Sequence, residues 1–226
     1  MTKINFDDYA QNYEQLASQQ TKLFDSDHSY FARYKVELMK RAACRSPSAV
    51  LDFGCGIGRS TSHLRFAFSD ARIVGCDLSS ESLAMARDVA PDSEFVFPNE
   101  IPPGPHFDLI LASYVFHHIP PDERQGALRY CLERLRLGGQ IFVFEHNPYN
   151  PVTRHFVNTC PFDADAILLT RRETTCRLLR AGFQISSAAY CLFFPQILSA
   201  LRPLEPAIGW LPLGGQYFVA GSARVV

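Results

Sequence analysis

The chain changes its hydrophobic periodicity near residue 45. Before that point, large apolar residues recur close to the 3.6-residue period of a helix. After it, short apolar runs alternate with segments of helical pattern, which is typical of a parallel sheet covered by helices on both faces. We therefore expect an α/β fold with a helical N-terminal cap over residues 1–45. The apolar positions that define this cap are Phe6, Tyr9, Tyr13, Leu16, Phe31, Tyr34 and Leu38.

The apolar runs after residue 45 predict seven short strands. Runs of four to eight residues bounded by glycine, proline and polar residues favour strands over helices. Two stretches, 146–169 and 191–215, interrupt the alternation, and we expect them to form structured insertions on the substrate side. The expected strands are 49–53, 72–76, 94–97, 107–112, 140–144, 184–190 and 216–221.

Two of the intervening helices have ends that the sequence marks. Thr170 and Glu173 form a capping-box pattern for one helix, which Gly182 ends. The other begins with proline and acids and ends with two glycines. Its expected start, buried stripe and end are Pro121-Asp122-Glu123, then Leu128, Cys131, Leu132 and Leu135, then Gly138-Gly139.

The first apolar run leads into an acid and three alternating glycines, Gly54, Gly56 and Gly58. Glycines between a strand and a helix let the backbone take positive φ and approach a ligand closely, and the helix directs its unbonded N–H groups to the same place. Asp77 ends the next apolar run, where an acid can hold the two hydroxyls of a ribose. The sequence therefore predicts a nucleoside site at the carboxyl ends of these strands.

A dinucleotide fingerprint does not fit this segment. The pattern G-x-G-x-x-G requires a third glycine where this chain has Arg59 or Thr61, depending on the starting glycine. Asp52, at the mouth of the first strand, would repel a pyrophosphate and attract an ammonium or sulfonium group. These two observations favour S-adenosylmethionine over a nicotinamide cofactor.

Three motifs resemble those of class I S-adenosylmethionine-dependent methyltransferases. They are the D-x-G-x-G-x-G pattern, Asp77 in Val74-Gly75-Cys76-Asp77, and Phe107-Asp108-Leu109-Ile110, and the resemblance covers roughly residues 49–144. It implies a Rossmann-like three-layer sandwich with seven strands in the order 3-2-1-4-5-7-6, the seventh antiparallel. It also implies S-adenosyl-L-methionine as cofactor and S-adenosyl-L-homocysteine as product.

The resemblance implies roles for nine residues. Asp52 would contact the methionine ammonium, Asp77 the ribose, and Leu78 the adenine. The adenine amino group would meet Asn99, Glu100 or the backbone alone, because the acid that often follows the third strand in this family is missing. The alternative role for Asp77 is to cap the helix that begins near Ser79. The full set of cofactor residues is Asp52, Gly54, Cys55, Gly56, Gly58, Asp77, Leu78, Asn99 and Ser113.

Four residues are candidates for the chemistry of methyl transfer. In-line transfer depends mostly on holding donor and acceptor in place, and a general base contributes if the acceptor is a hydroxyl. His117 and His118 follow the fourth strand, and Glu145 and His146 follow the fifth. Each has an alternative structural role in positioning a loop or capping a helix. No H-x-x-x-H pattern or acidic pair accompanies them, so the spacing indicates no metal.

Composition limits the function further. The 226 residues, 47% of them hydrophobic, suffice for one methyltransferase domain, with residues 46–145 as the cofactor-binding core. A net charge of −1 gives no general attraction to nucleic acid. Seven scattered cysteines indicate no disulfide framework or zinc site, and with no apolar signal or transmembrane segment we expect a cytoplasmic protein.

Together these observations predict methyl transfer to a small molecule. Oxygen is favoured over nitrogen or carbon because histidines lie near the pocket. The apolar segment 192–198 favours a hydrophobic, natural-product-like or lipid-like acceptor, a peripheral membrane contact or a partner surface, with ordinary core as the alternative. The rival functions are a nicotinamide-dependent oxidoreductase and a non-catalytic cofactor-binding or interaction module. The oligomeric state is not predicted.

Overall fold

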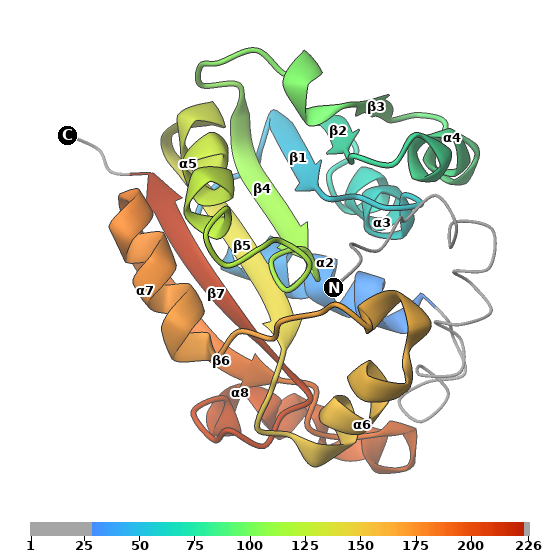
Figure 1. Cartoon of the computed structure of the whole chain (residues 1–226), viewed down its shortest axis with the longest axis vertical. Helices are drawn as coiled ribbons and strands as arrows, with labels where there is room; N and C mark the ends of the chain where they lie inside the picture. Colours follow the sequence, from blue (N-terminus) through green and yellow to red (C-terminus); the bar gives the residue numbers. More distant parts are fainter. Residues whose placement is uncertain (1–28, 224–226) are drawn as a thin grey trace.

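The computed structural model describes residues 29–223, which form an α/β fold around one seven-stranded sheet (Figure 1). The strand order is β3-β2-β1-β4-β5-β7-β6, and β7 pairs antiparallel with both β5 and β6. The predicted fold class, order and direction are therefore confirmed. Strand bounds are β1 Ala49–Phe53, β2 Arg72–Cys76, β3 Glu94–Val96, β4 Phe107–Ser113, β5 Leu135–His146, β6 Phe183–Cys191 and β7 Gln216–Ala223.

The predicted strands match these bounds closely except in β5. The expected helix before it does not begin at Pro121 but at Arg124, and α5 ends at Arg134. Leu135 and the Gly138-Gly139 pair belong to β5, because Leu135 already pairs with Phe107 across a register shift in β4. The predictions for these positions are wrong: a buried leucine four residues from Cys131 fits the helical period, but the sheet contact determines its conformation.

Helices cover both faces of the sheet. The helices α2 (Tyr30–Ala42) and α3 (Arg59–Ala67) pack on one face through a buried cluster that includes Met39 and Leu64. The helices α5 and α7 (Arg171–Ala181) pack on the other through Leu128 and Leu178. Thr170 accepts the predicted capping bond from the Glu173 N–H, and Gly182 ends α7 in the left-handed conformation. The predicted apolar residues Phe6, Tyr9, Tyr13 and Leu16 lie outside the described residues.

A carboxylate ties together the amino ends of β1 and β4, away from the predicted site. Asp108 accepts hydrogen bonds from the Ser48 N–H, the Ser48 hydroxyl and the Ala49 N–H. Arg45 and Arg136 pair with the same carboxylate at 3.1 and 2.8 Å. The acid of the F-D-L-I motif therefore has a structural role at this end of the sheet.

The two insertions form short helices beyond the carboxyl ends of β5 and β6 (Figure 1). The first contains α6 (Pro151–Thr159) and the 3-10 helix η4 (Pro161–Asp163), and the second contains η5 (Gln196–Leu204) and α8 (Glu205–Ile208). Glu205 joins the second insertion to the core, since its carboxylate accepts the backbone N–H groups of residues 192–194. Among residues 29–223, no helix has both the length and the apolar character that a membrane span requires.

Candidate functional site

The glycine loop after β1 has the conformation that the sequence predicts. Gly54, Gly56 and Gly58 all have positive φ, at 71°, 51° and 81°. A Cβ on Gly54 would lie 2.5 Å from Val115, whereas a Cβ on Gly56 would meet nothing within 4 Å. Gly54 is thus required for close packing against the segment after β4, and Gly56 borders open space.

Four N–H groups of this loop are bonded within the protein. Gly54 and Cys55 both donate to the Cys76 carbonyl, and Gly58 donates to the Cys55 carbonyl. Gly56 donates to the Asp77 carboxylate at 2.8 Å. A pyrophosphate needs unbonded N–H donors, while a methionine ammonium needs acceptors. The loop therefore fits the amino-acid arm of S-adenosylmethionine better than a dinucleotide.

The two predicted acids lie on either side of this loop. Asp52 is buried in β1, where its carboxylate accepts a hydrogen bond from Thr61 at 2.7 Å, and burial raises its pKa to about 7. Asp77 accepts from Gly56 with one oxygen and from the Ser79 N–H with the other. The helix α4 (Ser80–Val89) is capped by the Ser79 hydroxyl instead. Asp77 therefore connects the glycine loop to the start of α4.

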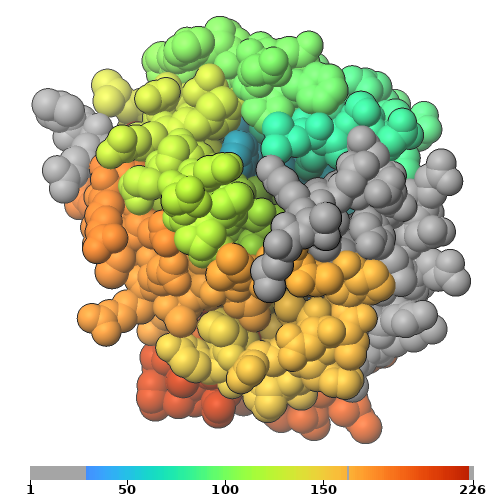
Figure 2. All heavy atoms as spheres, viewed as in Figure 1, coloured from blue at the N-terminus to red at the C-terminus, as the bar shows by residue number. Residues whose placement is uncertain are grey.

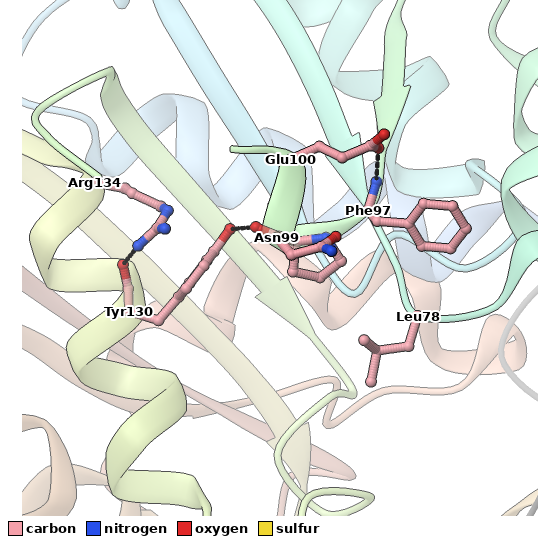
Figure 3. A pocket seen from close by; sticks show the side chains of 7 residues that line it. Leu78, Phe97, Asn99, Glu100, Tyr130 and Arg134 are labelled. Carbon is pink, nitrogen blue, oxygen red and sulfur yellow. Dashed lines mark hydrogen bonds between the residues drawn. The ribbon is translucent and has the colours of Figure 1, made fainter. Parts of the chain in front are cut away.

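A groove lies beside Asp77, lined by apolar and aromatic side chains together with polar ones. It encloses about 680 Å³ between Leu78, the η3 turn (Pro98–Glu100) and α5. Figure 3 shows Leu78 and Phe97 on one side and Tyr130 on the other, with Tyr130 donating to the Pro98 carbonyl. Glu100 accepts the Phe97 N–H, whereas Asn99 is exposed at the rim. In Figure 2 the surface is hollowed between the teal segment after β2 and the green segments around β3 and β4.

A buried lysine that the sequence analysis did not select lies beside the end of β4. The Nζ atom of Lys35, in α2, donates to the Ser113 hydroxyl at 2.8 Å and lies 3.2 Å from the centre of the Tyr114 ring. Burial lowers the pKa of Lys35 to about 7, although the neighbouring acids, Asp52 among them, partly offset the shift. The signal was present in the sequence, because Lys35 lies at positions i+4 from Phe31 and i−3 from Leu38, within the apolar stripe.

The ends of β4 and β5 bring the predicted catalytic candidates together. Glu145 accepts the Phe116 N–H with one oxygen and contacts His117 Nδ1 at 2.5 Å with the other. Asp163, from η4, lies 3.5 Å from His117 Nε2 and 3.4 Å from His118 Nε2. Sequence reasoning missed Asp163, since Pro161-Phe162-Asp163 follows no regular pattern and comes from the first insertion.

The fourth candidate, His146, stacks on Tyr114. The two ring centres are 4.2 Å apart with an angle of 13° between the planes, and the centre of the His117 ring is 5.2 Å from that of His146. Tyr114 has a φ of 63°, which is costly for a residue other than glycine and is found mostly at functional sites. Burial and the neighbouring His117 lower the pKa of His146 to about 3. Burial alone would lower the pKa of His117 as well, but Glu145 and Asp163 outweigh it and raise that pKa to about 9.

Comparison with known proteins agrees with this geometry. A family model described as a methyltransferase domain matches residues 51–141. The chain is 29% identical over 156 residues to an uncharacterized methyltransferase of Alkaliphilus oremlandii, which covers 64% of this chain and 68% of that protein. It is 30% identical over 129 residues to a trans-aconitate 2-methyltransferase of Rhodopseudomonas palustris, which covers 56% of this chain and 48% of that protein. The chain thus matches about half the length of the trans-aconitate relatives.

Solved structures share the whole architecture. A methyltransferase dependent on S-adenosylmethionine from Thermotoga maritima has a TM-score of 0.70 at 19% identity, covering 97% of this chain and 98% of that chain. The cyclase SpnF has a TM-score of 0.69 at 17% identity, covering 100% and 99%. At these identities the likeness shows the fold alone, and the reaction has to be argued from the site. The family match over residues 51–141, the strand order and the conformation of the glycine loop together support a class I S-adenosylmethionine-dependent methyltransferase, with S-adenosylmethionine as cofactor.

Proposed function

We propose that the chain transfers a methyl group from S-adenosylmethionine to an oxygen of a small molecule bound at the carboxyl ends of β4 and β5. The observation that carries this proposal is the stack of His146 on Tyr114. It places a half-buried imidazole against Tyr114, whose ring also contacts Nζ of Lys35, directly after the strand that borders the glycine loop. In open α/β sheets, ligands bind outside the carboxyl ends of the strands.

The cofactor roles in this proposal follow the contacts described above. Asp52 and the loop carbonyls would bind the methionine ammonium, and Lys35 would bind its carboxylate. Asp77, already oriented by Gly56 and Ser79, would hold the ribose hydroxyls.

The adenine would lie in the groove beside Asp77. Leu78 would cover the adenine, and Asn99 would meet its amino group, because the Glu100 carboxylate already accepts the Phe97 N–H. Cys55 is buried in the loop and contributes shape, not charge.

The protonation state of the imidazoles favours one kind of acceptor atom. S-adenosylmethionine supplies a carbon that is already activated, so the protein mainly binds and orients the acceptor. Among the four candidates, His117 and Glu145 contact each other, and the neutral His146 is best placed to face an acceptor. An imidazole whose pKa is lowered this far is a weak base. That favours an acidic oxygen, such as a carboxylate or an acidic hydroxyl, and the trans-aconitate relatives are consistent with this class.

The insertions supply the rest of the acceptor pocket in this proposal. Residues 46–145 are assigned as the cofactor-binding core, and residues 146–169 and 191–215 as the acceptor side. Tyr149 and Ile197, at 62% and 90% exposure, give the two insertions apolar surface that suits a partly hydrophobic acceptor. Seven free cysteines suit a reducing compartment such as the cytoplasm.

Two measurements test the proposal. Isothermal titration should show binding of S-adenosylhomocysteine and none of NAD(H). Turnover is then followed as S-adenosylhomocysteine formed with panels of small carboxylic acids, phenols, alcohols and amines, and mass spectrometry locates the methyl group in each product. Methylation of amines but not of any oxygen acceptor would contradict the choice of atom. Cofactor binding without turnover on any panel would instead favour the non-catalytic module.

A further inference from the structure

Three ligand-type side chains converge in one place at the ends of β4 and η4. The ligand atoms of His117, His118 and Asp163 all lie within 4.8 Å of one another. The Nε2 atoms of both histidines face the same oxygen, Oδ1 of Asp163, at 3.5 and 3.4 Å. The side chains of His117 and Asp163 are almost completely buried, and that of His118 is 15% exposed. The three side chains therefore form a largely buried group of potential metal ligands.

The distances from both histidines to Asp163 are long for charge-assisted hydrogen bonds. A charge-assisted bond between an imidazolium and a carboxylate has a length of about 2.7 to 2.9 Å. His117 makes a close contact of this kind on its other side, where Nδ1 lies 2.5 Å from Glu145. The two distances to Asp163 are longer by more than half an ångström. For a tetrahedral ion with ligand bonds of about 2.1 Å, ligand atoms lie about 3.4 Å from one another.

We propose that His117, His118 and Asp163 bind one divalent transition-metal ion, with Zn²⁺ as the ion these ligands favour. Two imidazole nitrogens and a carboxylate oxygen form a common ligand set for such ions, and three protein ligands leave a fourth position open. The pattern along the chain gave no indication of a metal because its ligands come from two separate segments. His117 and His118 follow β4, and Asp163 lies in the first insertion.

Glu145 occupies the position of a supporting residue for this site. Metal-binding histidines usually donate their second ring N–H to a carboxylate or carbonyl, which fixes the tautomer and the ring orientation. Glu145 contacts Nδ1 of His117 and is itself held by the Phe116 N–H. This arrangement directs Nε2 of His117 toward Asp163.

A buried arginine fixes the two ligand-bearing segments relative to each other. Arg124 donates to the Ile119 carbonyl at 2.9 Å, next to His118, and to the Ile167 carbonyl at 2.6 Å, beyond Asp163. The Ile167 N–H also donates directly to the His117 carbonyl at 2.9 Å. The ligands are thus held by a rigid scaffold before any ion enters, as a specific metal site requires.

The buried carboxylates on either side of His117 also favour a bound cation. Glu145 and Asp163 are both buried carboxylates, and buried charges are normally paired or coordinate metals. If the proposed function holds, the open position would take the acidic oxygen of the acceptor, because His117 lies next to the Tyr114–His146 stack.

The test is metal binding by the full chain, measured without reference to catalysis. Protein stripped with a chelator is titrated with Zn²⁺ in competition with a chromophoric chelator, and with Co²⁺ while its visible absorption is recorded. We expect one equivalent of either ion and the intense bands of four-coordinate cobalt. Failure of the wild-type chain to take up either ion would overturn the proposal, whether or not methyl transfer is found.

Variants locate the site. E145Q removes the supporting carboxylate and should lower Zn²⁺ affinity by roughly 10- to 100-fold. D163N and H118N each remove a ligand, and each should lower Zn²⁺ affinity by more than E145Q does. The matched control is H155N, which removes an exposed histidine of α6 outside the cluster and should change affinity by less than about twofold. Thermal unfolding of each variant reports whether it folds. Unchanged affinity in H118N, or an equal loss in H155N, would show that the ion binds elsewhere.

Discussion

The cofactor end and the acceptor end of the proposed site are built in different ways. At the cofactor end, backbone groups make most of the contacts, since the loop over residues 54–58 bonds to its own carbonyls, to Cys76 and to Asp77. At the acceptor end, side chains from distant segments make them, as when Glu145 and Asp163 meet His117. Both ends lie at the carboxyl edge of the same sheet (Figure 1).

This difference indicates which end can vary. A backbone cradle needs glycines and one acid at fixed spacing, so it tolerates few changes. A side-chain cluster held by an insertion can be rebuilt by changing that insertion, while the sheet stays as it is. We therefore expect a substitution at one end to leave ligand binding at the other end nearly unchanged.

The largest effect is expected for Arg124→Ala. This change removes a buried guanidinium that donates to the Ile119 and Ile167 carbonyls, and it should lower the free energy of unfolding by about 3 to 5 kcal/mol. Urea unfolding measures this loss, and Arg129→Ala, on the exposed side of α5, is the control. Affinity of the folded variant for S-adenosylhomocysteine should change by less than about threefold. A large loss of cofactor affinity would show that the two ends are coupled.

An effect of opposite sign is expected for Lys35→Met. Replacing a buried charge by an apolar side chain of similar volume should stabilise the protein by about 1 to 4 kcal/mol and raise Tm by about 2 to 4 °C per kcal/mol. If Lys35 binds the methionine carboxylate, cofactor affinity should fall at the same time. Lys40→Met, on the exposed side of the same helix, should change neither quantity appreciably. A fall in both stability and affinity would indicate that Lys35 is needed for packing.

The gain from Lys35→Met should also depend on pH. Burial lowers the pKa of Lys35 to about 7, with Cys191, Glu145 and Asp52 opposing the shift. Below that pH, Lys35 is charged in both the folded and unfolded states, so burial of its ammonium lowers the stability of the wild-type protein by the full amount. Above it the folded state binds fewer protons than the unfolded chain, and the cost falls as pH rises toward about 10.4. Unfolding at about pH 6 and about pH 9 should therefore show a larger gain at the lower pH.

The smallest effect of the three is expected for Asp77→Ala, which acts on the cofactor end alone. Loss of the ribose contacts should weaken S-adenosylhomocysteine binding by about 1.5 to 3 kcal/mol, roughly 10- to 150-fold. Isothermal titration measures this change, and Zn²⁺ binding at the acceptor end should not change. Asp70→Ala, after α3 and exposed, is the control. Unchanged cofactor affinity would leave Asp77 as a loop and helix anchor only.

The sequence predicted the strands and the conformation of the glycine loop well because their signals are local. Glycine spacing, an acid after each of two strands and short apolar runs are all properties of adjacent residues, and they led to the correct strands and the correct loop conformation. The order of the strands came from the family resemblance and not from periodicity. The predicted end of α5 was wrong. A leucine at position 135 fits both the apolar stripe of a helix and a buried strand, and its pairing with Phe107 places it in β5.

The acceptor end was predicted in part. His117, His118, Glu145 and His146 were selected because each follows a strand, and the structure brings them together. Asp163 and Lys35 were not selected. The position of Asp163 depends on how the first insertion folds back, and a lysine on an amphipathic helix is normally solvated. The contacts of Asp163 are tertiary and follow no local pattern, whereas the place of Lys35 within the apolar stripe of α2 was a local sign of its burial.

The internal bonding of the glycine loop has a consequence for how the protein meets its cofactor. Because the N–H groups of Gly54, Cys55 and Gly56 are already bonded to Cys76 and Asp77, the loop holds its shape before any ligand arrives. Amide hydrogen exchange should therefore be slow at these three positions in the free protein, and adding S-adenosylhomocysteine should slow it only slightly further.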